Sequence, residues 1–351
     1  KNGGSFSTLG SLNSVGGANP DGNLVRGADG FLYGTTSTGD VLSSNGTIFR
    51  LRTNGEEFEV LHRFTPSTGS SPSGGLLHAS DGKLYGTTQA GGANGNGVIF
   101  RFDPSDGSYI RLYSFSALGL EGRSPVAALV EGNDGHLYGA AVWAGSSSGG
   151  TLFRFHPTTL AFNTIRNLAP ALDGSLPSAA LIQGTDGFLY GTASARGSLG
   201  GGTVFRILGD GTEFSVIAAL DSSTVEGESP RDGVVVNGGF LYGTTMGGGQ
   251  GNVGTAFRMD LSGGGYSTLH PFVTATDGET PRGPLLRHSD GFLYGVTSYR
   301  GPGGGGTAFR LSAVDSTFEV VHPFVRASEG RDSWGGLTDG GAGYLYGTTS
   351  S

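Results

Sequence analysis

Short apolar runs alternate with polar and glycine-rich turns along the chain, and residues 279–330 show the pattern clearly. An apolar run at 281–287 is followed by the hairpin-turn pair Asp290-Gly291 and by a second run at 292–297. A glycine-rich loop at 301–306 leads to a third run at 307–311, and a polar connection leads to a fourth at 318–324. The pattern predicts four antiparallel β-strands per unit, which we call strands a, b, c and d in chain order.

The unit recurs along the whole chain, and the triplet Leu-Tyr-Gly marks each copy. The triplets begin 52 or 53 residues apart, at Leu32, Leu84, Leu137, Leu189, Leu241, Leu293 and Leu345. A period of this size, built from short strands and glycine turns, is typical of a β-propeller in which each unit is one blade. We therefore predict an all-β fold: residues 1–351 form one seven-bladed β-propeller domain with four antiparallel strands per blade. The blades start near residues 17, 71, 123, 175, 228, 279 and 331.

The two ends of the chain indicate how such a ring closes. Residues 6–9 align with strand d at 58–61, whereas the last residues align with the end of a strand b. We expect residues 1–12 to supply the outer strand of the last blade and to close the ring by pairing with it. No counterpart of strand c exists in the last unit, so this blade is incomplete in the chain. Trimmed sequence and a strand added by a partner chain are both open explanations.

Chain direction sorts the loops between two faces. By analogy with other four-stranded blades, strand a lines the central channel and strand d forms the outer edge. Because the strands reverse at each turn, the d-to-a connections and the b-to-c loops share one face, which we call the upper face.

Composition narrows the class of partner. The chain has no cysteine, which excludes disulfides and thiolate metal sites, and its net charge of −8 argues against nonspecific binding to nucleic acid or an anionic membrane. We find no apolar stretch of membrane-spanning length and no apolar signal core at the start, and we expect a processed, secreted protein. The seven histidines lack metal-ligand spacing. No metal site and no cofactor are expected, although a structural calcium ion stays open.

The repeat resembles a known family. The sequence at 81–88, Asp-Gly-Lys-Leu-Tyr-Gly-Thr-Thr, is followed by Gly91-Gly92, and residues 202–207 carry the related Gly-Thr-x-Phe-Arg motif. This combination resembles the tandem repeat of secreted choice-of-anchor GloVer-repeat proteins, and the resemblance covers essentially the whole chain. It implies an extracellular, propeller-like protein but brings no catalytic residues. Seven-bladed propeller lectins and polysaccharide lyases are similar in architecture alone.

Residues that recur in every blade are interpreted as scaffold. Phe-Arg pairs recur in strand c, beginning at Phe49, and we expect the phenylalanine to pack between blades while the arginine bonds a carboxylate or neighbouring carbonyls. Six identical ligand sites are the alternative. The recurrent Asp-Gly pairs fit hairpin turns better than calcium loops, which need a denser series of oxygen ligands.

Residues that break the repeat are the functional candidates, and they fall on the upper face. Trp143 and Tyr299 lie in b-to-c loops, and Trp334 lies where strand a of the last blade begins, a position held by arginine in the fifth and sixth blades. Asp232 replaces a glycine or alanine of the other blades. The candidates for a catalytic role are Tyr299, Arg282, Arg231 and Asp232, and those for substrate binding are Trp334, Arg300, Trp143, Arg196, Glu279 and Glu228.

This cluster predicts binding of an acidic polysaccharide or oligosaccharide. Aromatic faces stack on sugar rings, and guanidinium groups hold carboxylates or sulfates. Cleavage by β-elimination would use an arginine to neutralise the uronate carboxylate and Tyr299 as the base, which favours a polysaccharide lyase over a glycoside hydrolase. A hydrolase would need two carboxylates, for which Asp232 with Glu228 or Glu279 is the local supply. A non-catalytic lectin or adhesion module and a structural assembly protein are the alternatives, and structural pairing of these side chains is the simplest one.

Overall fold

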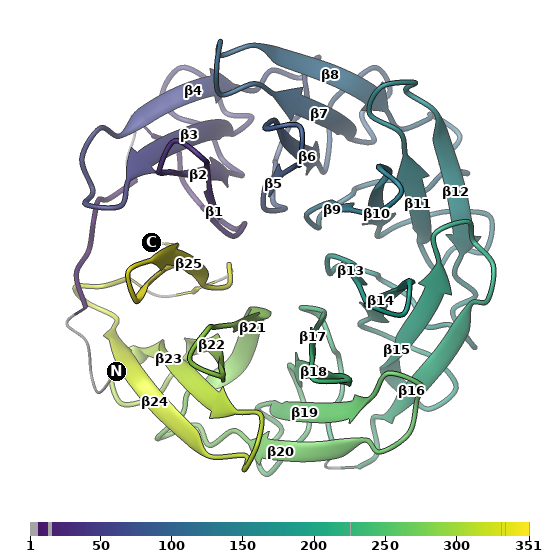
Figure 1. The fold of residues 1–351 in the computed structure, drawn as a ribbon, viewed down its shortest axis with the longest axis vertical. Coiled ribbons are helices and arrows are strands. Elements are labelled where there is room, and N and C mark those ends of the chain that lie inside the picture. The colour runs from purple at the N-terminus through teal and green to yellow at the C-terminus, as the bar shows by residue number, and fades with distance from the viewer. Residues whose placement is uncertain (1–5, 13–15, 225, 331, 334, 351) are drawn as a thin grey trace.

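The strands form a ring of radial sheets around a central opening (Figure 1). The structure is a computed structural model that describes residues 6–12, 16–224, 226–330, 332–333 and 335–350. The first three blades contain β1 (Val25–Arg26), β2 (Phe31–Thr36), β3 (Thr47–Arg52), β4 (Glu59–Arg63), β5 (Leu77–His78), β6 (Leu84–Thr88), β7 (Val98–Phe102), β8 (Tyr109–Ser114), β9 (Val130–Glu131), β10 (Leu137–Ala141), β11 (Thr151–Phe155) and β12 (Phe162–Asn167). The next three contain β13 (Ile182–Gln183), β14 (Phe188–Ala193), β15 (Gly200–Leu208), β16 (Ser215–Asp221), β17 (Val234–Asn237), β18 (Phe240–Thr245), β19 (Thr255–Asp260), β20 (Ser267–Pro271), β21 (Glu279–Arg287), β22 (Phe292–Tyr299), β23 (Gly304–Ser312) and β24 (Phe318–Val325).

The prediction of seven four-stranded blades is wrong. Within the described residues the ring has six four-stranded antiparallel sheets, and its seventh sector holds only the two-stranded sheet of β25 (Thr338–Gly341) and β26 (Tyr344–Tyr346). Residues 6–12 form no strand, so strand pairing does not close the ring there. The physical reason is that an outer strand pairs with the backbone of strand c, and no strand follows β26 in the described part of the chain.

Side-chain packing takes the place of strand pairing at this closure. The Phe6 ring stacks on the His322 imidazole of β24, with centroids 4.4 Å apart and planes 9° apart. The same contact joins neighbouring outer strands elsewhere, as between His270 of β20 and Phe318 of β24 at 3.7 Å. Phe6 therefore occupies the aromatic position of an outer strand without being part of a sheet. On the inner side, the Tyr346 hydroxyl donates to the Thr53 carbonyl oxygen at 3.1 Å.

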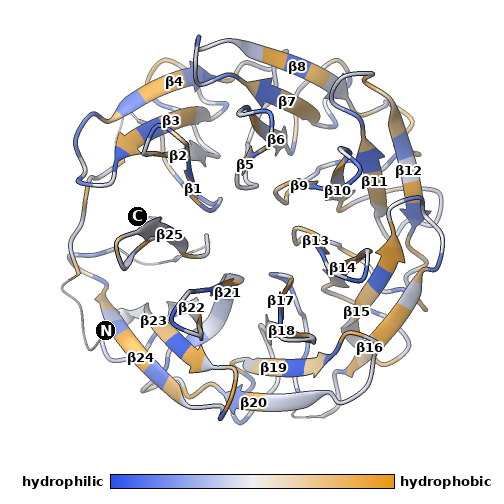
Figure 2. Cartoon of the chain, viewed as in Figure 1, coloured by the Kyte–Doolittle hydropathy of each residue, from blue (hydrophilic) through white to orange (hydrophobic). Residues whose placement is uncertain are grey.

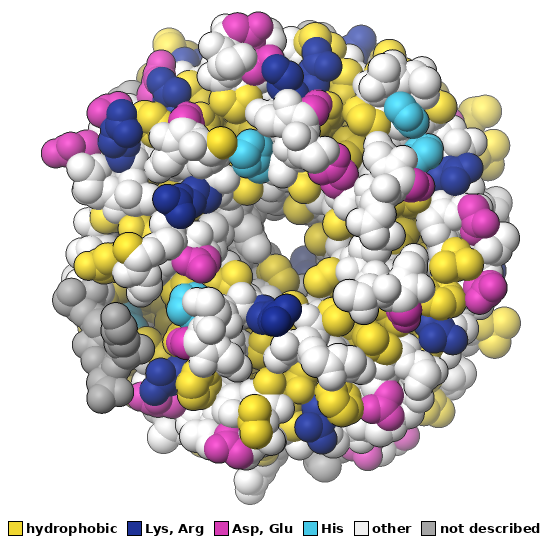
Figure 3. Space-filling view, in the orientation of Figure 1, with side chains coloured by type: hydrophobic (Ala, Val, Ile, Leu, Met, Phe, Trp, Pro, Cys, Tyr) yellow, Lys and Arg dark blue, Asp and Glu magenta, His cyan; other side chains and the backbone are white. Residues whose placement is uncertain are grey.

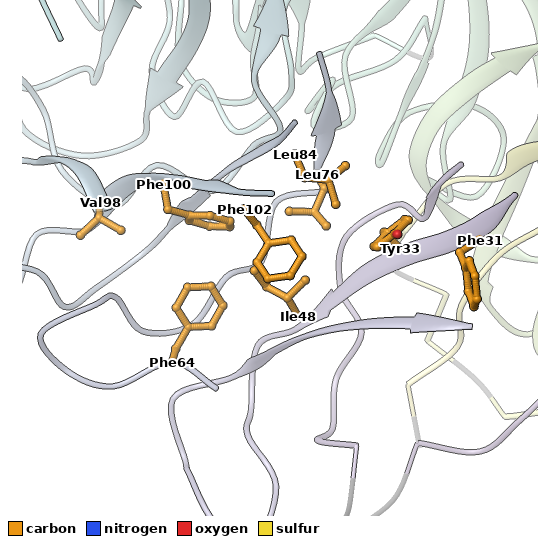
Figure 4. Packing of buried hydrophobic residues seen from close by; sticks show 9 residues of the cluster. All are labelled: Phe31, Tyr33, Ile48, Phe64, Leu76, Leu84, Val98, Phe100 and Phe102. Carbon is orange, nitrogen blue, oxygen red and sulfur yellow. The ribbon is translucent and has the colours of Figure 1, made fainter. Parts of the chain in front are cut away.

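The core lies between adjacent blades because each sheet presents apolar side chains to both neighbours. Outer strands alternate hydrophobic and hydrophilic residues (Figure 2), as expected for sheets with one face packed against the next layer. In the centre of the ring the space-filling view shows an opening that side chains do not fill (Figure 3). Figure 4 shows one inter-blade cluster, in which Phe64 and Phe100 pack edge to face with centroids 5.2 Å apart.

Small residues let the innermost segments of adjacent blades touch. A Cβ atom on Gly22 would lie 2.7 Å from the Gly75 nitrogen, and one on Gly74 would lie 2.7 Å from the Ala127 carbonyl carbon. Such distances leave no room for a side chain, so small residues are required at these positions. This ring of small residues, at 22, 74, 127, 179, 283 and 335, is the hub of the propeller, and Asp232 is its exception.

The recurrent tyrosines and aspartates bond to each other at the a-to-b turns. The Tyr138 hydroxyl donates to Asp134 at 2.7 Å, and the same bond recurs in the first, second, fourth and sixth blades. The other Asp134 oxygen accepts the His136 N–H. Burial of the tyrosines and the adjacent carboxylate both raise the pKa of Tyr190, to about 12. The aspartates are thus turn caps and hydroxyl acceptors.

The Phe-Arg pairs also have structural partners. Each phenylalanine of the series is at most 2% exposed. Arg206 lies over the Phe188 ring at 4.5 Å and donates to the Leu261 carbonyl oxygen of the next blade at 3.5 Å, whereas Arg310 pairs with Glu319 of its own blade.

Candidate functional site

The d-to-a connections and the b-to-c loops meet at one end of every complete blade. They are joined there by a two-residue antiparallel bridge, which we call the rim bridge. The rim bridges are Ala18–Thr38, Ser70–Ala90, Arg123–Trp143, Ser175–Ala195, Glu228–Gly247 and Glu279–Tyr299. Their backbone pairing is constant while their side chains vary, so the fold does not dictate which residues stand there. Only the third and sixth bridges combine an aromatic with a charged residue among those described.

Three charged residues lie where the fifth and sixth blades reach the hub: Asp232 at a hub position, and Arg231 and Arg282 at the position just before it, where no other described blade has an arginine. Arg231 is exposed, Asp232 beside it is partly buried, and Arg282 on β21 is only 7% exposed. Asp232 accepts a hydrogen bond from the Gly283 N–H, which links the two blades. We call Arg231, Asp232 and Arg282 the mouth cluster.

Burial governs the electrostatics of the mouth cluster. Desolvation raises the pKa of Asp232 to about 6, although Arg282, the Gly283 N–H and Arg231 all favour its ionised form. Burial likewise lowers the pKa of Arg282, against the opposing effects of Asp232, Tyr299 and Asp332. Asp232 is therefore poised to change its charge in the mildly acidic range, which no other hub position can do.

Tyr299, Glu279 and Arg300 belong to the sixth blade, which also carries Arg282 of the mouth cluster. Glu279 begins β21, Tyr299 ends β22, and the two are paired in register. Arg300, with 71% of its side chain exposed, approaches the Glu279 carboxylate at 3.5 Å. An exposed pair of this kind contributes at most about 1 kcal/mol, so Arg300 is held loosely enough to exchange this carboxylate for that of a ligand.

Arg196 and Arg300 adopt a backbone conformation that suits glycine. Their φ angles are 63° and 61°, and the equivalent residues of the second and fifth blades are Gly91 and Gly248 with φ of 78° and 85°. A left-handed conformation costs a non-glycine residue about 1–2 kcal/mol. Because glycine fits both positions, the arginines are not required by the fold, and this cost makes them candidates for function.

The predicted residues do not all converge on one place. The structure brings Arg231, Asp232 and Arg282 together with Tyr299, while Trp143 lies on the third blade, on another part of the ring (Figure 1). Arg196 is exposed on the fourth blade, between the two areas. The partly buried Glu228 side chain lies over Gly247 of its own rim bridge. Trp334 lies outside the described residues.

Sequence reasoning missed two groups of residues. Asp332 contributes to the electrostatics of Arg282, but it is an ordinary polar residue in a connection and nothing in the repeat marks it. Gln89 and Asn96 share a pocket with Trp143, and comparison of the b-to-c loops beside Trp143 would have indicated them. In the described part of the chain no group of three or more His, Cys, Asp or Glu side chains could hold a metal ion.

Comparisons with solved structures show the fold. The extracellular domain of a B. thetaiotaomicron protein assigned to the one-component systems is 11% identical, with a TM-score of 0.60, and the match covers 90% of this chain and 35% of that one. A Bacteroides uniformis protein assigned as a 6-phosphogluconolactonase is 15% identical (TM-score 0.54, covering 86% and 84%). A chain of a nidogen/laminin complex is 13% identical (TM-score 0.53, covering 87% and 96%).

The sequence comparison identifies the family. No curated protein matches the chain, and among the described residues no helix has the length and apolar character needed to span a membrane. The Gloeobacter/Verrucomicrobia repeat matches residues 1–198 and 178–351, which agrees with the resemblance found in the repeat motifs. The chain belongs to the Gloeobacter/Verrucomicrobia repeat family.

Proposed function

We propose that the upper face is an extracellular binding surface for an acidic saccharide and that the mouth cluster holds one of its anionic sugar residues. The observation that carries the proposal is the gathering of three charged residues where the fifth and sixth blades meet. Asp232 stands at a hub position where the other blades have glycine or alanine, and Arg231 and Arg282 stand immediately before the hub residue, where the first four blades have Asp21, Ser73, Val126 and Ser178. Burying the charges of Asp232 and Arg282 costs stability, so folding alone does not explain these two residues.

The exposed and buried arginines have different roles in this proposal. Arg231 is exposed, its guanidinium makes no hydrogen bond or ion pair with the described residues, and it can donate two parallel hydrogen bonds to a uronate carboxylate. Arg282 adds positive potential from its buried position, because low solvent access strengthens the electrostatic attraction of its charge for an anion. Tyr299 and Arg300 would contact the sugar from the sixth blade. Structural neighbours that are extracellular domains support an extracellular location.

Calorimetric titration with tetragalacturonate tests the proposal, with neutral maltotetraose as the comparison ligand. Arg231→Ala should weaken tetragalacturonate binding at least tenfold, since a charge-assisted hydrogen bond contributes about 1.5–3 kcal/mol. Arg287→Ala is the matched control, because Arg287 is an exposed arginine at the opposite end of β21. Equal affinity for both sugars, or equal losses in the two variants, would refute the proposal.

The same samples decide between binding and cleavage. β-Elimination creates unsaturated uronate ends that absorb ultraviolet light, so a rising absorbance during incubation identifies a lyase. If it rises, Tyr299→Phe should abolish the rise and retain binding, because only the hydroxyl that would act as the base is lost. A flat trace with intact binding identifies a lectin-like module.

A further inference from the structure

A pocket lies on the upper face between the second and third blades. Its volume is about 460 Å³, within the usual range for small-ligand sites. Arg123, Trp143 and Ser124 of the third blade form one side, and the second-blade loop forms the other with Gln89, Ala90, Gly95 and Asn96. None of these residues belongs to the mouth cluster.

Backbone hydrogen bonds fix the walls of this pocket. Arg123 and Trp143 exchange both bonds of their rim bridge, at 2.9 and 3.2 Å between nitrogen and oxygen. The Ser124 N–H donates to the Asn96 carbonyl oxygen at 3.0 Å, which ties the third blade to the second-blade loop. A ligand therefore meets a preformed surface, and little ordering is required on binding.

The side chains supply the chemistry of a sugar site. Trp143 is 50% exposed, an unusually open position for a tryptophan, and its indole lines the pocket. Arg123 is exposed, and its guanidinium makes no hydrogen bond or ion pair with the described residues. The side-chain amide nitrogen of Gln89 donates to the Ser73 hydroxyl at 2.9 Å, which leaves the side-chain oxygen Oε1 of Gln89 as an acceptor for sugar hydroxyls.

The other rim bridges show that the fold does not need these side chains. Four of the five described counterparts of Trp143 are Thr38, Ala90, Ala195 and Gly247, and their blades have the same bridge. A large half-exposed aromatic beside an unpaired guanidinium is thus an addition to the blade, and both groups face one pocket.

We propose that this pocket is a second saccharide site, separate from the mouth cluster. A uronate residue stacks its ring on Trp143 and directs its carboxylate to Arg123, and the amide oxygens of Gln89 and Asn96 accept hydrogen bonds from its hydroxyls. The choice of an acidic sugar rests on the proposed function, whereas the pocket itself does not depend on the mouth cluster.

Tryptophan fluorescence tests this site directly. The chain has two tryptophans, so Trp334→Phe leaves Trp143 as the sole source of indole emission. Saturating tetragalacturonate should change this emission and reduce its quenching by acrylamide at least twofold, and maltotetraose should do so less. Arg123→Ala in the same background should weaken the tetragalacturonate affinity, read from the fluorescence titration, at least tenfold. Circular dichroism checks that the ring is folded. An emission and a quenching constant that tetragalacturonate leaves unchanged would overturn the proposal.

Adding Arg231→Ala to the single-tryptophan protein separates the two proposals. A Trp143 response that survives this change supports an independent pocket, and a response that disappears overturns its independence. If Arg231→Ala abolishes the calorimetric binding and tetragalacturonate changes Trp143 emission in neither protein, the pocket proposal is refuted and the mouth-cluster proposal stands. If tetragalacturonate changes Trp143 emission and Arg231→Ala leaves the calorimetric affinity unchanged, the mouth-cluster proposal is refuted and the pocket proposal stands.

Discussion

Protonation of Asp232 should strengthen binding of an acidic saccharide at the mouth cluster. The carboxylate has a pKa of about 6, so it is charged at neutral pH and largely neutral at about pH 5. A uronate carboxyl, with an ordinary pKa of about 3.5, stays ionised over this range. The ligand is therefore repelled by Asp232 at neutral pH and no longer repelled in mild acid, while Arg231 and Arg282 stay positive.

The size of the effect follows from Coulomb's law. A ligand carboxylate about 6 Å from Asp232 at an effective dielectric constant of about 40 is repelled by about 1.4 kcal/mol. This repulsion would raise the pKa of Asp232 by about one further unit on binding. Linkage then makes binding about sevenfold weaker at about pH 7.5 than at about pH 5.

Calorimetric titrations with tetragalacturonate across this pH range are the assay. Asp232→Asn keeps the shape and an acceptor for the Gly283 N–H but cannot ionise, so its affinity should be flat and close to the wild-type value in mild acid. Asp21→Asn is the matched control, because burial also raises the pKa of Asp21 but it lies on the first blade. A wild-type affinity that is constant, or that rises with pH, would refute the reasoning, as would a sevenfold change that persists in Asp232→Asn.

Four further substitutions test the scaffold by denaturant unfolding. Phe6→Ala should lower the unfolding free energy by about 2 kcal/mol, since Phe6 is 40% exposed and buries the rest of its ring at the closure; an unchanged midpoint would show that this contact does not hold the ring shut. Tyr138→Phe should cost about 1–2 kcal/mol by removing a hydrogen bond to a carboxylate, and Tyr242→Phe should cost less because its hydroxyl donates to the neutral Ala313 carbonyl at 3.2 Å; the reverse order would contradict this account. Arg196→Gly should raise stability by about 0.5–1 kcal/mol by relieving its left-handed backbone, and a loss of that size would show that the arginine stabilises the loop.

The strands within each blade could be predicted from the sequence, but the way the ring closes could not. Residues that recur at Leu-Tyr-Gly and Phe-Arg hold the same strand positions in each complete blade, so one repeat predicts where they all lie, although their polar partners differ between blades. The predicted closure required residues 1–12 to pair with the last blade. Alignment of the repeats shows that this blade has no strand c, and without strand c an outer strand has no backbone to pair with among the described residues. Packing of Phe6 on His322 preserves only the side-chain part of the expected contact.

The candidate site was predicted by face but not by position around the ring. Alignment of the repeats shows that Trp143 and Tyr299 hold equivalent loop positions, which places both on the upper face. It does not bring together blades that lie apart in the circle, so Trp143 and the mouth cluster were joined in the prediction. Asp232 could be identified because a carboxylate among glycines and alanines is a visible exception. The recurrent spacing of four residues between Asp134 and Tyr138 is also visible in the sequence. The fifth blade lacks this pair, because Gly238 stands four residues before Tyr242.

The rim bridge has a consequence for how such proteins can diversify. Its two backbone hydrogen bonds hold whichever side chains occupy the pair, from Ala18 and Thr38 to Arg123 and Trp143. Each blade can therefore exchange its pair without disturbing the next, and substitutions in distant blades should combine additively. The backbone of the upper face stays constant while the side chains of each rim bridge vary, so recombining blades within one chain would create new binding specificities.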